Sequence, residues 1–119
     1  MRVMVIIKAN KESEAGVMPS EALLNAMGKF NEELVNAGIM LAGEGLHPSS
    51  KAKRIKFSGG NRIVTDGPFA ETREQLGGYF LIDAKNLDEA LAVAARIPMA
   101  RKGTVEIRPV MEIAGLPTD

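Results

Sequence analysis

The sequence contains no cysteine and a single histidine. Without cysteine there is no disulfide framework, no thiolate nucleophile and no thiolate ligand for a zinc or iron–sulfur site. One histidine also removes most other metal constellations, because transition-metal sites commonly combine several imidazoles or thiolates. We therefore expect no metal site, and the lack of cysteine is typical of a reducing compartment.

Net charge and long hydrophobic runs are also missing. Lys and Arg total 15 and Asp and Glu total 15, so no net basic field attracts phosphate backbones, and nucleic acid is not an expected partner. The first ten residues, MRVMVIIKAN, contain only about nine strand-like residues, too few for a cleavable signal peptide or a membrane span. We expect a cytoplasmic protein that does not contact membranes.

The chain is expected to form one domain over residues 1–119, because that length supports a core and no linker, low-complexity run or repeat divides it. Hydrophobic periodicity predicts the secondary structure. Helices are expected between Ser20 and Gly38 and between Asn86 and Pro98, the second with Leu87, Ala90, Leu91, Ala94 and Ile97 on its apolar face. Strands are expected at 2–9, 39–46, 77–84 and 103–113, with a hairpin from 53–57 and 61–65.

This order predicts an α+β fold, a ferredoxin-like βαββαβ sandwich with an inserted β-hairpin. Two helices cover only one face of such a sheet, yet the first strand is apolar on both faces: Val3, Val5 and Ile7 alternate with Met4 and Ile6. A second apolar face left in water would be unusually large for a monomer. We expect a homodimer whose sheets face each other; the alternative is a monomer whose hairpin covers that face.

The last strand places Val105 and Ile107 on one face and Glu106 and Arg108 on the other. If the apolar pair packs on the helices, the charged pair lies on the second face. There Glu106 and Arg108 neutralise one another, bridge to a second subunit or bind a polar ligand.

Four segments carry a resemblance to a known family: AGEGLHPS (42–49), VTDGPFAETREQLGGYFLID (64–83), LDEALAVAARIP (87–98) and VEIRPV (105–110). Together they resemble the YCII-related family, in particular its DGPF-domain branch. The resemblance implies a ferredoxin-like domain that dimerises into an α/β barrel. It also implies a cleft in which a histidine and an aspartate form an acid/base pair, and the matching positions are His47 and Asp66.

The chemistry of these two residues leaves alternatives open. Histidine donates and accepts protons near neutral pH, so His47 suits a proton shuttle in a cleft, whereas its structural role would be a hydrogen bond to a carbonyl or simple exposure. Asp66 suits either an Asx-type turn or the orientation of His47. Within the same turn, Gly67 is expected for backbone freedom, Pro68 as the first residue of a short helix, and Phe69 as a plug under the turn.

No phosphate-binding glycine fingerprint or nucleophile elbow is present, and nothing indicates haem, flavin or nicotinamide, so no cofactor is expected. One hypothesis is a cofactor-independent enzyme that isomerises, eliminates from or hydrates a small anionic or hydroxylated molecule. In it His47 moves the proton, Asp66 orients His47, and Arg108, Arg54 or Arg62 holds the anion; the hairpin arginines otherwise protect the edge. The alternative is a non-catalytic ligand-binding or regulatory module with a protein partner, which the resemblance suggests is a sigma factor.

Overall fold

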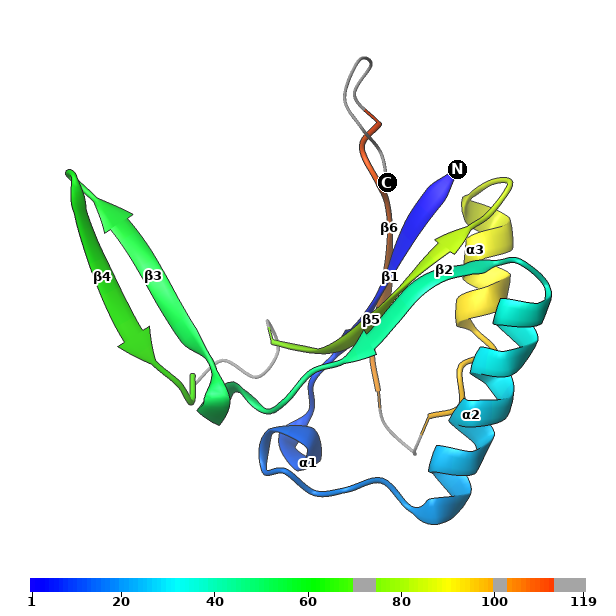
Figure 1. Cartoon of the computed structure of the whole chain (residues 1–119), viewed down its shortest axis with the longest axis horizontal. Coiled ribbons are helices and arrows are strands. Elements are labelled where there is room, and N and C mark those ends of the chain that lie inside the picture. Colours follow the sequence, from blue (N-terminus) through cyan, green and yellow to red (C-terminus); the bar gives the residue numbers. More distant parts are fainter. Residues whose placement is uncertain (70–74, 100–102, 113–119) are drawn as a thin grey trace.

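The computed structural model describes residues 1–69, 75–99 and 103–112. Four antiparallel strands form the main sheet in the order β2-β5-β1-β6, with bounds Met40–Gly45, Leu76–Asp83, Arg2–Lys8 and Val105–Pro109 (Figure 1). The helices are α1 (Lys11–Glu14), α2 (Glu21–Asn36) and α3 (Leu87–Ala94), with a short 3₁₀ helix, η1 (Ser49–Lys51). The α+β class and the ferredoxin-like order are confirmed.

The helices begin where side chains satisfy their free amides. Ser20 accepts from Leu23 N at 3.1 Å to cap α2, and Asn86 accepts from Glu89 N at 2.8 Å to cap α3. Gly38, with φ of 72°, follows the end of α2 as expected. None of the helices in the described ranges is long and apolar enough to cross a membrane.

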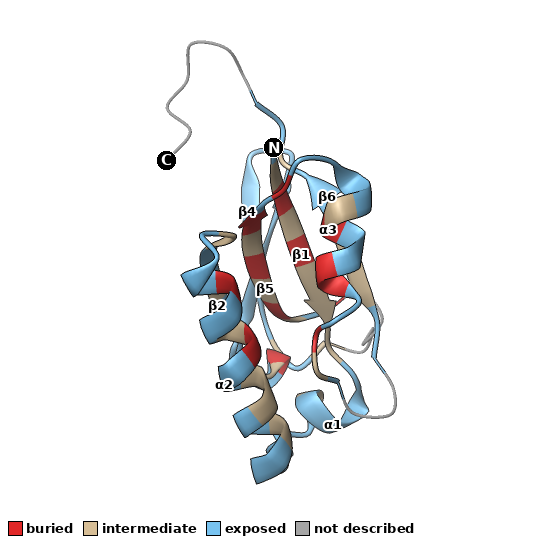
Figure 2. Ribbon diagram, turned by 90° about the vertical axis from the view of Figure 1, so that its right-hand side faces the viewer, coloured by how far each residue is buried: buried red, intermediate tan, exposed pale blue. Residues whose placement is uncertain are grey.

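The core lies on one face of the sheet, between the strands and both long helices (Figure 2). Val3, Val5, Phe80 and Ile82 meet helix side chains, among which Leu34 is 2% exposed. The predicted face of α3 is wrong in part, because Leu87 and Leu91 are 42% and 57% exposed. The buried stripe instead runs through Ala90, Val93, Ala94 and Ile97, whose largely small side chains let the helix approach the sheet closely.

The opposite, outward face carries Met4 beside Leu81 and Ile6 beside Tyr79, all half-buried. Val105 and Ile107 pack toward the core as expected, so Glu106 and Arg108 lie on the outward face. Arg108 forms an ion pair with Glu106, and Lys8 Nζ lies 3.6 Å from the same carboxylate. The predicted mutual neutralisation of Glu106 and Arg108 is confirmed.

The hairpin β3 (Lys53–Ser58) and β4 (Asn61–Asp66) forms a separate two-stranded sheet that projects from the domain (Figure 1); we refer to residues 53–66 as the arm. Gly59 and Gly60 make its turn with φ of 56° and 84°. Every strand residue in it is exposed. The radius of gyration, 16.3 Å, exceeds the roughly 14 Å expected for a compact chain of this length. Within one chain, the arm does not cover the outward face.

The base of the arm is closed by a short network. Lys53 Nζ donates to Asp66 Oδ1 at 2.6 Å, and Gly67 N donates to Ala52 O at 2.8 Å. A Cβ added at Gly67 would lie 1.7 Å from Ser49 O. Gly67 has no positive φ, so the expected reason for a glycine here was wrong: it is required by close packing. Pro68 and Phe69 lie in no helix, so the expected short helix does not begin at Pro68; residues 70–74, which follow, lie outside the described residues.

The residues after β6 are held against β1. Arg2 donates from Nε and Nη2 to the two carboxylate oxygens of Glu112, at 3.0 and 3.1 Å. The hydrogen bond from Arg2 holds the pKa of Glu112 below its usual range. This ion pair is exposed, so it orients the segment more than it stabilises the fold.

The Gly67–Ser49 contact predicts that Gly67→Ala destabilises the domain by about 1 to 3 kcal/mol, because the new methyl group displaces backbone. Urea denaturation followed by circular dichroism measures the change. Gly28→Ala is the control: a Cβ at Gly28 meets nothing within 4 Å, so helix propensity should raise stability by up to about 1 kcal/mol. Unchanged stability of Gly67→Ala would contradict the close contact.

Candidate functional site

A pocket of about 430 Å³ opens at the base of the arm. Its walls come from α1, the loop after β2, η1, the first residues of β3 and the start of β5. The chain reaches it directly after β2, where Leu46 N donates to Gly77 O at 2.9 Å. Polar side chains on the walls include Glu14, His47, Ser49, Lys51, Arg54 and Gln75.

A buried polar cluster forms one wall. Ser49 is 6% exposed; its amide donates to Glu14 Oε1 at 3.0 Å, and its hydroxyl donates to the other oxygen of the same carboxylate. Phe69 N donates to Ser49 Oγ at 3.3 Å, and Gln75 Nε2 donates to Phe69 O at 2.7 Å. These bonds join four chain segments and give a pocket wall whose buried polar groups are partnered.

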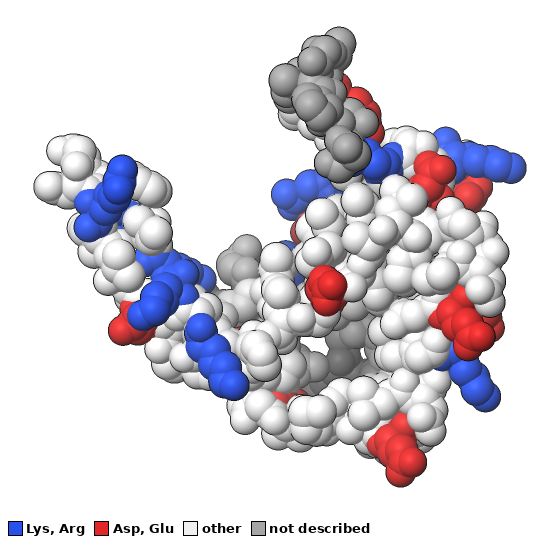
Figure 3. Space-filling model, in the orientation of Figure 1, with Lys and Arg blue, Asp and Glu red and all other residues white. Residues whose placement is uncertain are grey.

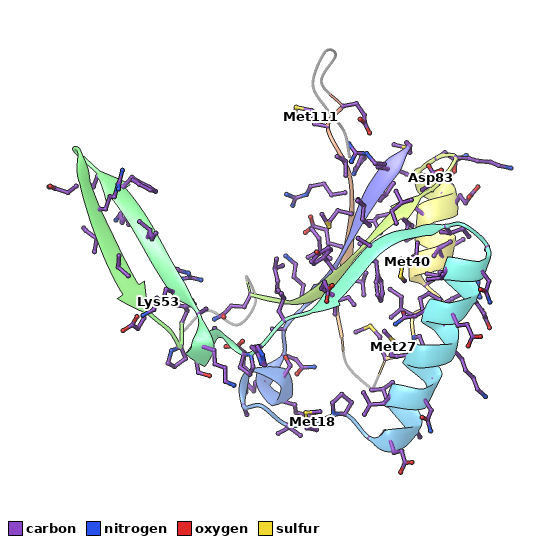
Figure 4. The ribbon with its side chains drawn as sticks, in the orientation of Figure 1. Met18, Met27, Met40, Lys53, Asp83 and Met111 are labelled. Atoms are coloured by element: carbon purple, nitrogen blue, oxygen red, sulfur yellow. The ribbon has the colours of Figure 1, made fainter. Side chains whose placement is uncertain are left out.

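Cationic side chains dominate the pocket's charge. The Arg54 guanidinium stacks on the Phe69 ring, with its carbon 3.7 Å from the ring centroid. Lys51 and Lys53 also line the pocket, and Figure 4 labels Lys53 at the base of the arm. Lys53 is paired with Asp66. Among the described residues that line the pocket, Glu14 is the acidic one, and its carboxylate oxygens are engaged by Ser49. The described part of the lining therefore carries a net positive charge, which suits an anion.

His47, Arg54 and Phe69, all singled out from the sequence, line this pocket together. The side chain of His47 is exposed, and Phe69 is half-buried. Phe69 lies outside the buried core cluster and supports Arg54, which differs from the plug expected from the sequence.

The other candidates lie elsewhere. The exposed Asp66 carboxylate accepts from Lys53, and it is not among the residues that line the pocket. Among the described residues no hydrogen bond joins Asp66 to His47 or to a turn amide, so the acid/base pair stays a prediction. Arg62 lies 5.8 Å from the Phe57 ring farther along the arm, and Glu106 and Arg108 lie on β6.

Sequence reasoning missed Glu14, Ser49 and Gln75. The pattern Asn10-Lys11-Glu12-Ser13 carries the capping box that starts α1, with Asn10 Oδ1 accepting from Ser13 N at 2.8 Å, so this helix had a local signal. The contact between Glu14 and Ser49 spans 35 residues and has no local signal. In residues 1–69, 75–99 and 103–112, no three His, Asp or Glu side chains gather as a metal site would require.

Comparison with known proteins shows the family of the chain. The sequence model of the YCII-related domain matches residues 1–114. The chain is also 39% identical over 92 residues to an uncharacterised protein of Rhizobium meliloti (strain 1021), and the match covers 76% of this chain and 74% of that protein. With a one-domain match of this extent and a ferredoxin-like sheet, the chain belongs to the YCII-related family.

Proposed function

We propose that the pocket at the base of the arm binds a small anionic or hydroxylated molecule and that His47 moves a proton on it without a cofactor. The observation that carries the proposal is the meeting of an exposed imidazole with Lys51 and Arg54 in one pocket of about 430 Å³. A pocket of this size lies within the range of small-ligand sites. The cations hold the anion and stabilise charge that develops on it.

His47 supplies the acid/base group, because imidazole both accepts and donates protons near neutral pH. Isomerisation, elimination or hydration requires only such transfers. Asp66 is the proposed orienting carboxylate. To act in this role, it has to leave Lys53 and accept a hydrogen bond from His47. Glu14 lines the same pocket as His47 and is the alternative orienting group.

The proposed assembly is a homodimer in which the arm of one copy packs against the body of the other. An isolated two-stranded hairpin is marginally stable in water, and the arm exposes Ile55, Phe57 and Val64 on one face, at 56%, 71% and 59%. The arm holds four of the 15 basic residues and one of the 15 acidic ones, so it carries +3 and the rest of the chain carries −3. Figure 3 shows the basic side chains along the arm. In the proposed dimer their charge complements the net negative charge of the rest of the second copy.

The same exposed arm supports the second candidate function, a regulatory module whose arm contacts a different protein, such as a sigma factor. Its apolar face and positive charge would suit an acidic partner surface. The concentration dependence of self-association distinguishes an arm that packs against a second copy from an arm that contacts a different protein.

Arg54→Gln is expected to weaken binding of malonate, a simple dicarboxylate probe, by roughly tenfold, because a charge-assisted hydrogen bond is lost. Amide chemical shifts of His47 and Lys51, titrated by NMR, measure the affinity. Arg62→Gln is the matched control, since Arg62 lies on the same arm but outside the pocket. Equal weakening by the two variants would show that the effect comes from the overall charge of the arm, and it would exclude Arg54 as a direct ligand of the anion.

Proton transfer is tested by deuterium incorporation from D₂O into pyruvate, oxaloacetate and acetoacetate, followed by proton NMR. The wild type is expected to accelerate exchange in at least one of these carbon acids, and His47→Gln is expected to lower that rate about 10² to 10⁴-fold. Wild-type rates equal to buffer rates for all three, or unchanged rates in His47→Gln, would remove the catalytic role of His47.

Dimerisation is tested by sedimentation equilibrium of the wild type, Phe57→Ser and Ile63→Ser. Phe57 and Ile63 lie on opposite faces of the arm and are 71% and 52% exposed. Loss of a buried phenylalanine side chain is expected to raise the dimer dissociation constant at least tenfold in Phe57→Ser, with a smaller change in Ile63→Ser. A wild type that stays monomeric at all concentrations would contradict the homodimer and favour a different protein partner.

A further inference from the structure

A groove lies between the first turns of α2, the loop that leads into α2 and the end of the sheet, and Figure 3 shows the surface hollowed there. Its volume is about 600 Å³, and it is open to solvent. It shares no lining residue with the pocket at the base of the arm. An open groove of this kind suits a segment of polypeptide. We refer to it as the α2 groove.

Apolar side chains line the α2 groove and remain exposed. Val17 and Met18, in the loop before α2, are 58% and 76% exposed, and Met99 is 37% exposed. Leu23 and Met27 on α2 line the same space and are half-buried. Methionine side chains are flexible and polarisable, so they adapt to an apolar partner. Exposed apolar surface that is contiguous in this way marks an interaction site.

The wall formed by α1, the loop and α2 is acidic. Residues 10–36 contain five acidic and two basic residues and carry −3, whereas the arm carries +3. Figure 3 shows acidic side chains over α2 and basic side chains along the arm. Glu12 lines the α2 groove itself and is exposed. An apolar groove with an acidic wall suits a segment that is both apolar and basic.

The arm combines these two properties on one face. Ile55 pairs with Val64 and Phe57 pairs with Arg62, so these four side chains lie on the same face of the hairpin. Its strands of six residues span about 20 Å. Residues 21–31 of α2, along the groove, span about 16 Å. The arm therefore matches the α2 groove in length as well as in charge.

The arm does not reach the α2 groove of its own chain. It projects away from α1 and α2 (Figure 1). The close contact between Gly67 and the Ser49 carbonyl oxygen fixes its base in that direction. In a dimer with twofold symmetry, each arm extends toward the other copy, and the same contact forms twice.

We propose that the α2 groove receives the arm of a second copy, so that two chains exchange arms. The apolar face of the arm packs on Met18, Leu23 and Met27. Arg62 of one copy lies beside Glu12 of the other and neutralises it. This inference rests on the proposed homodimer and names the surface that receives the arm.

Cross-linking tests the contact, because a chain without cysteine reports only the thiols that are introduced. Val64→Cys is mixed with Met18→Cys and treated with a short bismaleimide. One variant is labelled with heavy nitrogen, so mass spectrometry identifies the mixed dimer. We expect this dimer to form roughly tenfold faster than the one with Met111→Cys, because docking raises the local thiol concentration. Met111 is 80% exposed and lies beyond β6, far from Met18 in Figure 4.

A third cysteine variant, Leu81→Cys, reports the outward face of the sheet. Faster cross-linking of Val64→Cys to Leu81→Cys than to Met18→Cys would place the arm on that face. This result would overturn the proposal and leave the homodimer intact, as would equal rates with Met18→Cys and Met111→Cys. A wild type that stays monomeric in sedimentation equilibrium would instead remove the homodimer and this inference together.

A charge-exchange cycle tests the pair of Arg62 and Glu12 by sedimentation equilibrium. Arg62→Glu and Glu12→Arg are each expected to raise the dimer dissociation constant about tenfold, and the double variant to return it to within about threefold of the wild type. Lys56→Glu with Glu12→Arg is the control, because Lys56 lies on the opposite face of the arm. No recovery in the double variant, or equal recovery in the control, would exclude the contact. If Val64→Cys prevents dimerisation, this cycle still decides the question.

Discussion

The placement of the arm and of the pocket depends on the packing around Ser49. Its carbonyl oxygen lies so close to Gly67 that no side chain fits there, and its amide and hydroxyl both donate to Glu14. Its hydroxyl oxygen also accepts from Phe69 N. One buried serine thus joins the helix after β1, the chain after β2 and the turn after the arm, segments that are far apart in the sequence.

This junction gives three residues of the Asp-Gly-Pro-Phe turn a structural explanation. Asp66 closes the last pair of the hairpin with Lys53, and Gly67 allows the close approach to Ser49. Phe69 then supports Arg54 at the pocket wall. The turn therefore anchors the arm and shapes the cationic pocket at the same time, so a change at Gly67 should affect both.

Glycines at the ends of β2 and β5 have a further consequence for the sheet. Gly45 and Gly78 contribute no side chain to the core-side row that they share with Ile7, whereas His47 and Ser49, which follow Gly45 at once, form part of the other pocket. Two hollow regions of different chemistry, the α2 groove and the cationic pocket, thus lie next to the same end of the sheet. The buried residues of α2 and α3 pack over the rows beyond it and hold the sheet together.

The elements were predictable where the signal was local. Alternation in β1 and β6, the caps Ser20 and Asn86, and the glycine turn of the arm are properties of neighbouring residues. The buried face of α3 was misjudged, because the position of α3 over the sheet, which no local pattern specifies, buries Val93 and exposes Leu91. Of the site, His47 and Arg54 were predictable from their chemistry, whereas Glu14 and Ser49 meet only in the folded chain.

Native-state amide hydrogen exchange, followed residue by residue with NMR, tests the central role of Ser49 most directly. If the junction is one cooperative unit, the amides of Ser49, Gly67 and Phe69 exchange with a common opening free energy. Ser49→Ala should then accelerate exchange at Gly67 and Phe69 together. A Phe69 amide that exchanges at the unprotected rate while Ser49 stays protected, or a Gly67 amide unaffected by Ser49→Ala, would contradict this account.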